Sequence, residues 1–144
     1  MNTSVENFSL NIRADQKPAS ASFNNGNVEL SNNNLCQILS ISSFTALQPN
    51  WDSYAAKAPN AAAITKAVNF IVKQVNAQGR EVFFTAPTAD GDIVVELKNN
   101  KCSIELIFSG EVHDRIMCSC NGEHHAEGDL NETTYMSYIK WLYQ

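Results

Sequence analysis

Several features that would assign a function are missing from this sequence of 144 residues. No apolar run approaches the roughly 18–20 residues that a membrane-spanning helix requires. The first six residues contain neither a basic region nor an apolar signal segment. The sequence also lacks the Gly-x-Ser-x-Gly, P-loop and Gly-x-Gly-x-x-Gly motifs. These absences predict a cytoplasmic protein that does not enter a membrane and has no recognisable catalytic set.

Basic residues are few and scattered. Ten Lys and Arg stand against fifteen Asp and Glu, so the formal net charge is −5 and the pI is about 5.1. A protein that binds nucleic acid without sequence preference needs a concentrated basic surface to displace counterions. The charge therefore disfavours nucleic acid as a partner. An acidic surface can dock a basic partner or mimic nucleic acid, but it more often serves solubility.

The cysteine content gives a second indication of compartment. Four cysteines are present, Cys36, Cys102, Cys118 and Cys120. Without an export signal we expect them to be reduced thiols, because reducing compartments keep disulfides rare. Cys36 lies on the apolar face of a predicted helix, so we expect it in the core.

Residues 1–30 differ in composition from the rest of the chain, being rich in Asn and Ser. Apolar alternation around Phe8–Ile12 and Val28–Leu30 fits a hairpin that turns at Asn25-Gly26. The polar composition fits a tail equally well, since it offers little apolar area to offset the entropy of ordering. Residues 31–144 are predicted to form a single domain, long enough to bury a core of its own.

Apolar residues at helical spacing predict three helices. The first covers residues 34–47, with Asn and Ser residues before it as the N-cap. The strongest covers residues 61–78, between Asn60 and Gly79. Its apolar stripe consists of Ile64, Ala67, Val68, Ile71, Val72 and Val75. A C-terminal helix is predicted to begin at a capping box formed by Asp129 and Glu132.

After Arg80 the apolar period becomes two, which predicts strands around Val82–Phe84, Ile93–Leu97, Ile104–Phe108 and Ile116–Cys120. Pairs such as Asp90-Gly91 and Asn121-Gly122 between them tolerate positive φ and favour tight hairpins. We therefore predict an α+β fold. An antiparallel β-meander of four to six strands is packed on one face by the 61–78 helix and flanked by the N- and C-terminal helices.

An aromatic loop, Asn50-Trp51-Asp52-Ser53-Tyr54-Ala55-Ala56-Lys57, precedes the strongest helix. Exposed Trp and Tyr offer contact area at low entropy cost, so Trp51, Asp52, Tyr54 and Lys57 are candidate binding residues. Alternatively, Trp51 closes the edge of the core as a lid between the two helices. The structural interpretation is favoured, and the binding interpretation stays open.

His113 and Trp141 complete the candidate binding residues. A His–carboxylate pair such as His113 with Asp114 can act as a general base, but a nucleophile at defined spacing is missing. Cys118, Cys120 and His124 alone have the character of metal ligands. One residue separates the two cysteines, as expected of small apolar side chains on the inner face of a strand. We therefore predict no metal and no other cofactor.

The loop and the later stretch Ala86-Pro87-Thr88-Ala89-Asp90-Gly91-Asp92-Ile93 resemble a group of small bacterial proteins of unassigned function. In that group a Trp-Asp-Gly-Tyr-Gly-Ala block precedes a helix, and Pro-Thr-x-Asp-Gly leads into a strand. The likeness covers residues 50–97, with Ser53 and Ala55 in place of two glycines. It implies an accessory gene of a mobile element, plasmid or phage-related locus, and it transfers no catalytic residue.

Together these patterns predict a small non-catalytic protein that binds another protein or a second copy of itself. Its surface would be the Trp51–Lys57 loop, the exposed sheet face or the aromatic C-terminus. One alternative is a small-molecule binder or enzyme with a cleft between helix and sheet, where Tyr54, Lys57, His113 and Asp114 would be the polar groups. A second alternative is a zinc protein that uses Cys118, Cys120 and His124.

Overall fold

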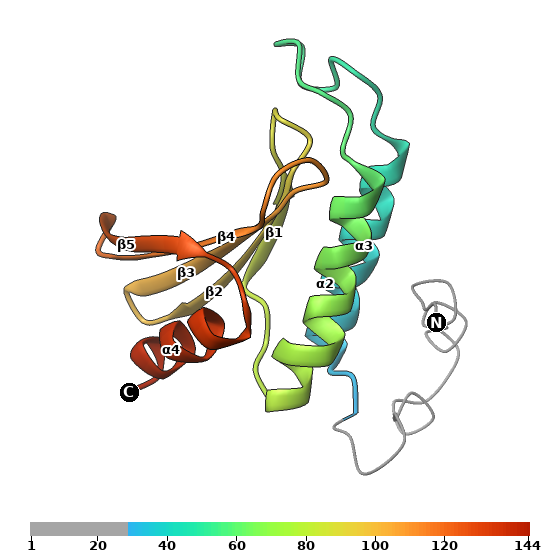
Figure 1. Cartoon of the computed structure of the whole chain (residues 1–144). Helices are drawn as coiled ribbons and strands as arrows, with labels where there is room; N and C mark the ends of the chain where they lie inside the picture. Colours follow the sequence, from blue (N-terminus) through green and yellow to red (C-terminus); the bar gives the residue numbers. More distant parts are fainter. Residues whose placement is uncertain (1–28) are drawn as a thin grey trace.

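Three helices cover one face of a five-stranded sheet in the computed structural model, which describes residues 29–144 (Figure 1). The helices are α2 (Asn32–Ser43), α3 (Ala61–Phe70) and α4 (Glu132–Leu142). A 3-10 turn, η2 (Phe44–Ala46), continues α2. A π-helical turn, η3 (Ile71–Val75), and a 3-10 turn, η4 (Asn76–Gln78), extend α3 as far as Gly79, which adopts a left-handed φ of 74°.

The sheet is an antiparallel meander in the order β1-β2-β3-β4-β5. Its strands are β1 (Phe84–Pro87), β2 (Ile93–Asn99), β3 (Cys102–Phe108), β4 (Arg115–Cys120) and β5 (Glu123–Asp129). Asn100, Asn121 and Gly122 all have positive φ in the tight turns, as their residue types allow. The predicted α+β class and meander are therefore confirmed.

The core lies between the helices and the strand residues on one side of the pleat. Helix α2 contacts β1, α3 contacts β2 and β3, and α4 contacts β3 and β4. The predicted stripe of α3 and η3 is buried except for Val72, which is partly buried, and Val68, Ile71 and Val75 are at 0% exposure. Opposite it lie Val95 and Leu106, which are paired across β2 and β3 and are also at 0%. Burying an Ile side chain fully contributes roughly 1.5–3 kcal/mol, so this stripe is a main source of stability.

A buried pair of amide side chains joins the ends of α2, η4 and the segment that enters β1. The Asn34 side chain donates to Asn76 Oδ1 and to the Arg80 carbonyl, both at 3.0 Å, and accepts from the Val82 backbone N–H at 2.9 Å. Asn34 is fully buried, so each of these bonds satisfies a group that would otherwise lose its hydration. The sequence pattern did not reveal this pair.

The start of α3 packs directly against the turn between β3 and β4. Asn60 caps the helix, and its Oδ1 accepts from the N–H groups of Ala62 and Ala63 at 2.8 and 3.2 Å. The same side chain fills the space beside Gly110, where an added Cβ would collide with the Asn60 amide. Position 110 therefore requires glycine because there is no room for a side chain, and not because of its φ angle.

The cap of α4 differs from the predicted one. Asn131 and Thr134 form the capping box. Asn131 Oδ1 accepts from the Thr134 N–H at 2.9 Å, and Thr134 Oγ1 accepts from the Asn131 N–H at 3.0 Å. Asp129 is instead the last residue of β5, paired with Arg115. Asp129 thus belongs to a strand that the sequence pattern did not predict, and the helix is capped two residues later, so the prediction of Asp129 with Glu132 was wrong.

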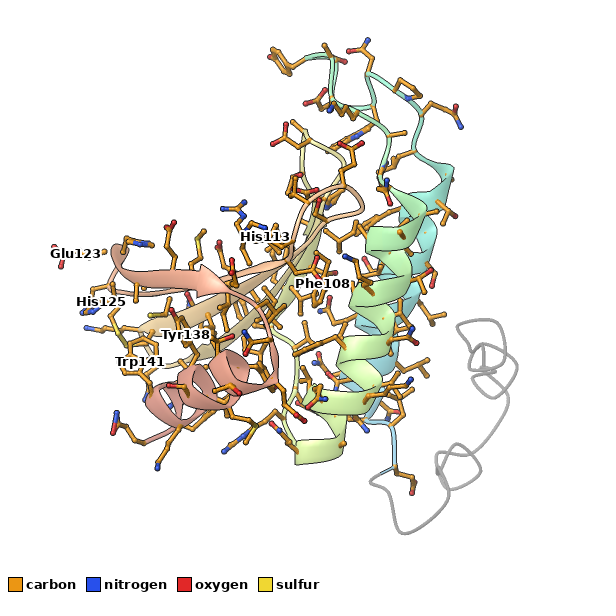
Figure 2. All side chains as sticks on the ribbon, viewed as in Figure 1. Phe108, His113, Glu123, His125, Tyr138 and Trp141 are labelled. Atoms are coloured by element: carbon orange, nitrogen blue, oxygen red, sulfur yellow. A yellow bond between two sulfur atoms is a disulfide. The ribbon has the colours of Figure 1, made fainter. Side chains whose placement is uncertain are left out.

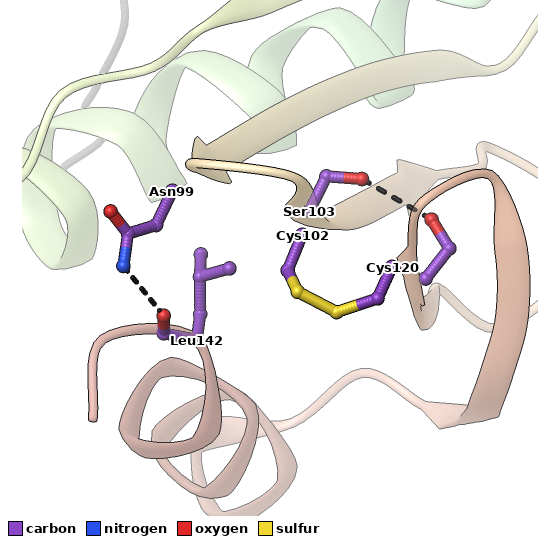
Figure 3. Close-up of a disulfide and its surroundings, with 6 residues drawn as sticks. Asn99, Cys102, Ser103, Cys120 and Leu142 are labelled. Atoms are coloured by element: carbon purple, nitrogen blue, oxygen red, sulfur yellow. Dashed lines mark hydrogen bonds between the residues drawn. A yellow bond between two sulfur atoms is a disulfide. The ribbon is translucent and has the colours of Figure 1, made fainter.

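Two expectations about the cysteines are corrected. Cys102 and Cys120 are directly opposite each other on β3 and β4 and form a disulfide (Figure 3). The expectation of four reduced thiols is therefore wrong for this pair. Cys36 is exposed on α2, because the helix turns its Ile38 and Ile41 side into the core. Cys118 is free and buried, as expected.

Strand β5 has no apolar alternation to reveal it. Of its seven residues, only Gly128 is partly shielded, so no buried face appears in its sequence. The hairpin proposed around Phe8–Ile12 and Val28–Leu30 lies outside the described residues, apart from Leu30, which is buried in the core at 4% exposure. Within residues 29–144, each helix is too short or too polar to span a bilayer.

Candidate functional site

The loop between η2 and α3 is held by its own backbone and by two short side chains. The Asn50 N–H donates to the Ala56 carbonyl at 2.7 Å and closes the loop. Asp52 Oδ1 accepts from the N–H groups of Tyr54 and Ala56 at 2.8 and 3.1 Å, and Asn50 Oδ1 accepts from the Ala55 N–H at 2.7 Å. Asp52 thus builds an Asx-type turn, which accounts for its position in the loop.

Three residues of this loop adopt the left-handed backbone region without being glycine. The φ values are 69° at Asn50, 67° at Ser53 and 67° at Ala55. For Asn this conformation is common, but for an ordinary L-residue it costs roughly 1–2 kcal/mol. The loop therefore holds strain at Ser53 and Ala55, and its internal hydrogen bonds keep it in that shape.

The two aromatic rings of the loop have different environments. Trp51 is half-buried, and its indole N–H donates to the Lys57 carbonyl at 2.9 Å, so it closes the loop from within. Tyr54 is 87% exposed, the most exposed of the large hydrophobic residues described. Ala56, between them and the helix, is buried at 2%. Trp51 is thus bonded to the backbone of its own loop, and Tyr54 stands free on the surface.

The loop is also bonded to the turn that precedes β2. The Lys57 N–H donates to the Ala89 carbonyl at 2.8 Å, and the Asn60 N–H donates to the Gly91 carbonyl at 2.9 Å. Gly91 has a φ of +88°, and a Cβ there would lie 3.0 Å from the Ala58 carbonyl oxygen. Only glycine suits this contact, so the two segments form one surface at the end of the α2–α3 pair (Figure 1).

His113 and Asp114 lie apart from the loop and do not form one site with it. Asp114 Oδ1 accepts from the Ser109 N–H at 2.9 Å and pairs with Lys66 Nζ at 2.8 Å. His113 points outward from the β3–β4 turn and its Nε2 lies 3.0 Å from Asp129 Oδ1 (Figure 2). Asp114 therefore fastens a turn, and its carboxylate is not free to act as a base partner of His113.

A small cavity of about 270 Å³ lies between α3 and the β3–β4 turn. Its walls include Phe70 and Phe108, whose ring centroids are 5.5 Å apart, and the Lys66–Asp114 ion pair. This is the helix–sheet cleft that the second functional hypothesis requires. It is smaller than the roughly 300–1,000 Å³ typical of ligand pockets, and neither Tyr54 nor Lys57 lines it.

The residues with metal-ligand character are not arranged as ligands. Cys120 Sγ is bonded to Cys102 and is therefore no thiolate. Burial raises the pKa of the Cys118 thiol, which keeps it protonated and inert. His124 Nε2 lies 3.3 Å from Glu127 Oε1 on the exposed strand β5. Over residues 29–144, no group of three or more His, Cys, Asp or Glu side chains is placed to hold a metal ion.

Trp141 packs between α4 and β5 rather than standing free. Its ring centroid lies 6.0 Å from that of His125, at the end of the molecule where Tyr138 also faces β5 (Figure 2). The ring is half-buried and belongs to the edge of the core. Burial raises the pKa of the Tyr138 hydroxyl in the same region.

The sheet face opposite the helices carries a pair of facing acidic side chains. Glu96 and Glu105 are direct cross-strand partners on β2 and β3. Partial burial raises the pKa of Glu96, and the neighbouring Glu105 charge raises it further, whereas Lys98 and a Ser103 hydrogen bond lower it. Like charges placed opposite each other weaken a sheet slightly. The arrangement gives this face its acidic character but assembles no catalytic pair.

Comparisons with protein-family models, with curated proteins and with solved structures find no match for this chain.

Proposed function

We propose that this protein is a small non-catalytic interaction module that binds a protein partner through the 50–57 loop, with Tyr54 as the anchoring side chain. The observation that carries the proposal is a ring 87% exposed on a backbone that hydrogen bonds fix in place. A preformed loop loses little entropy on binding, and buried Tyr side chains are frequent hot spots of interfaces.

The strain in the loop supports the same proposal. Left-handed backbone at Ser53 and Ala55 lowers stability, and such strain is found where a shape serves a purpose other than folding. These two positions are also those at which the resembled bacterial group has glycine. The resemblance implies that the gene belongs to an accessory or mobile genetic element, and this coincidence supports that origin. We include this origin in the proposal.

The test compares two variants of the full chain, Tyr54→Ala and Phe84→Ala. Phe84 is also aromatic and is 51% exposed, but it lies on β1. A photo-crosslinking residue beside position 54 captures the partner in cells that express the protein, and native mass spectrometry reports self-association. Tyr54→Ala is expected to reduce capture more than about tenfold, because loss of a hot spot exceeds about 1.4 kcal/mol.

Phe84→Ala is expected to leave capture unchanged. Equal capture by both variants would overturn the assignment of the loop. A wild-type chain that is monomeric and crosslinks to nothing would overturn the interaction function itself.

A further inference from the structure

A second, larger cavity lies at the opposite end of the α2–α3 pair from the 50–57 loop. It has a volume of about 430 Å³, within the range of small-molecule pockets. Four segments meet there: the residues before α2, the end of η4, strand β2 and the residue after α4. The side chains used below are Glu29, Ser31, Arg80, Glu81, Lys98 and Tyr143.

Two cations line this cavity without a carboxylate of the described residues at salt-bridge distance, although Lys98 also acts electrostatically on Glu96. The Arg80 guanidinium carbon lies 3.8 Å from the centroid of the Tyr143 ring, and Lys98 Nζ lies 4.9 Å from that of Phe83. Among residues 29–144, neither cation has an ion-pair partner within 4.0 Å. The cation–π contact holds the guanidinium over the ring and forms no hydrogen bond with it, so the N–H groups of Arg80 stay available for an acceptor.

Two anions line the same cavity, so its formal charges balance. Glu29 and Glu81 carry them, and both stay more than 4.0 Å from Arg80 and Lys98. Opposite charges that share a pocket without pairing leave both kinds of charge available to a ligand. A ligand with only negative charges would meet the two glutamates and be repelled.

We propose that this cavity binds a small zwitterion of amino-acid or dipeptide size. Arg80 and Lys98 would take its carboxylate, and Glu81 and Glu29 would take its ammonium group. The Ser31 hydroxyl, whose oxygen already accepts from the Asn34 N–H at 3.0 Å, keeps its own proton free to donate to the ligand. This site is independent of the 50–57 loop and its partner.

The test is a titration of the full ¹⁵N-labelled chain, followed by the backbone amide shifts of Gly79, Arg80 and Lys98. The probes are diglycine, N-acetylglycine, which has only the carboxylate, and glycinamide, which has only the ammonium group, at matched ionic strength. Diglycine is expected to shift these amides saturably, and each half-ligand is expected to bind more than about tenfold more weakly, because it lacks one of two charge contacts.

Variants separate the site from a general effect of charge. Arg80→Gln and Lys98→Gln are each expected to raise the dissociation constant of diglycine by about tenfold or more. Lys73→Gln, at the smaller cavity, is expected to leave it unchanged. If Arg80→Gln disturbs the fold through the lost ring contact, Lys98→Gln, an exposed position, still tests the site. The proposal is overturned if diglycine produces no saturable shift, or if N-acetylglycine binds as tightly as diglycine.

Discussion

The helix–sheet core and the 50–57 loop keep their shapes in opposite ways. The core has regular backbone, and its order comes from side chains such as Ile71 and Leu106, both at 0% exposure. In the loop, order comes from hydrogen bonds of the backbone and of the Asn50, Trp51 and Asp52 side chains, which hold three non-glycine residues at positive φ. The core therefore depends on the size of its side chains, whereas the loop depends on the backbone conformations that its residues allow.

The largest effect is expected from removing bulk in the core. Ile71→Ala should lower the free energy of unfolding by about 2–5 kcal/mol, because the surrounding helix and sheet cannot close the cavity. Leu39→Ala is the control, since Leu39 is 54% exposed on α2 and its loss should cost no more than about 0.5 kcal/mol. Urea unfolding followed by circular dichroism measures both. Equal losses would show that the buried face of η3 does not contribute to the core.

The stability of the sheet is expected to depend on the Cys102–Cys120 disulfide as well as on packing. The double variant Cys102→Ala, Cys120→Ala should lose about 3 kcal/mol, the value expected for a crosslink of similar span, since 18 positions separate the two residues. A reductant should lower the stability of the wild type by a similar amount and leave the double variant unchanged. If both respond equally, the bond does not contribute as the structure implies.

The same bond bears on cellular location. Disulfides persist in oxidising compartments and are rare in the cytoplasm, so the redox state of this pair in cells tests the cytoplasmic location, which stays a prediction. Lysing the cells in denaturant with an alkylating reagent present exposes and counts the free thiols. We expect the two free cysteines, Cys36 and Cys118, to be labelled and Cys102 and Cys120 to be protected.

The smallest effect, with the opposite sign, is expected in the loop. Ala55→Gly should raise the free energy of unfolding by about 0.5–1 kcal/mol. Glycine relieves the left-handed strain, but it also makes the unfolded chain more flexible, and this gain in unfolded-state entropy offsets part of the stabilisation. Ala62→Gly, on the exposed side of α3, makes the same chemical change at helical backbone angles and should lower stability by up to about 1 kcal/mol. Thermal unfolding of both variants supplies the comparison. A loss at both positions would mean that Ala55 is not strained.

The sequence predicts what is periodic and local. The stripe from Ile64 to Val75, the Asn60 cap and the Asn121-Gly122 turn were recognisable because each is encoded within a few neighbouring residues. Strand β5 was not recognisable, since it lies at the sheet edge with almost every side chain exposed. The disulfide depends on the register of β3 against β4, which no pattern within either strand fixes.

The candidate sites show the same limit. The 50–57 loop could be located from its Trp and Tyr, but which ring is buried depends on the Trp51 bond to the Lys57 carbonyl. The larger cavity left no signal, because Ser31, Arg80, Lys98 and Tyr143 come from four separate segments. In the sequence, each of these residues taken alone is typical of an ordinary protein surface.

Gly110 and Gly79 show why a glycine should not be judged by its residue type alone. At Gly79 a side chain would point into open space and only the φ of +74° opposes it, so a residue such as Asn, which tolerates that angle, can replace it. At Gly110 a single methyl group would displace the amide that starts α3. In natural variants of this chain, the residue at position 79 should vary, whereas position 110 should remain glycine.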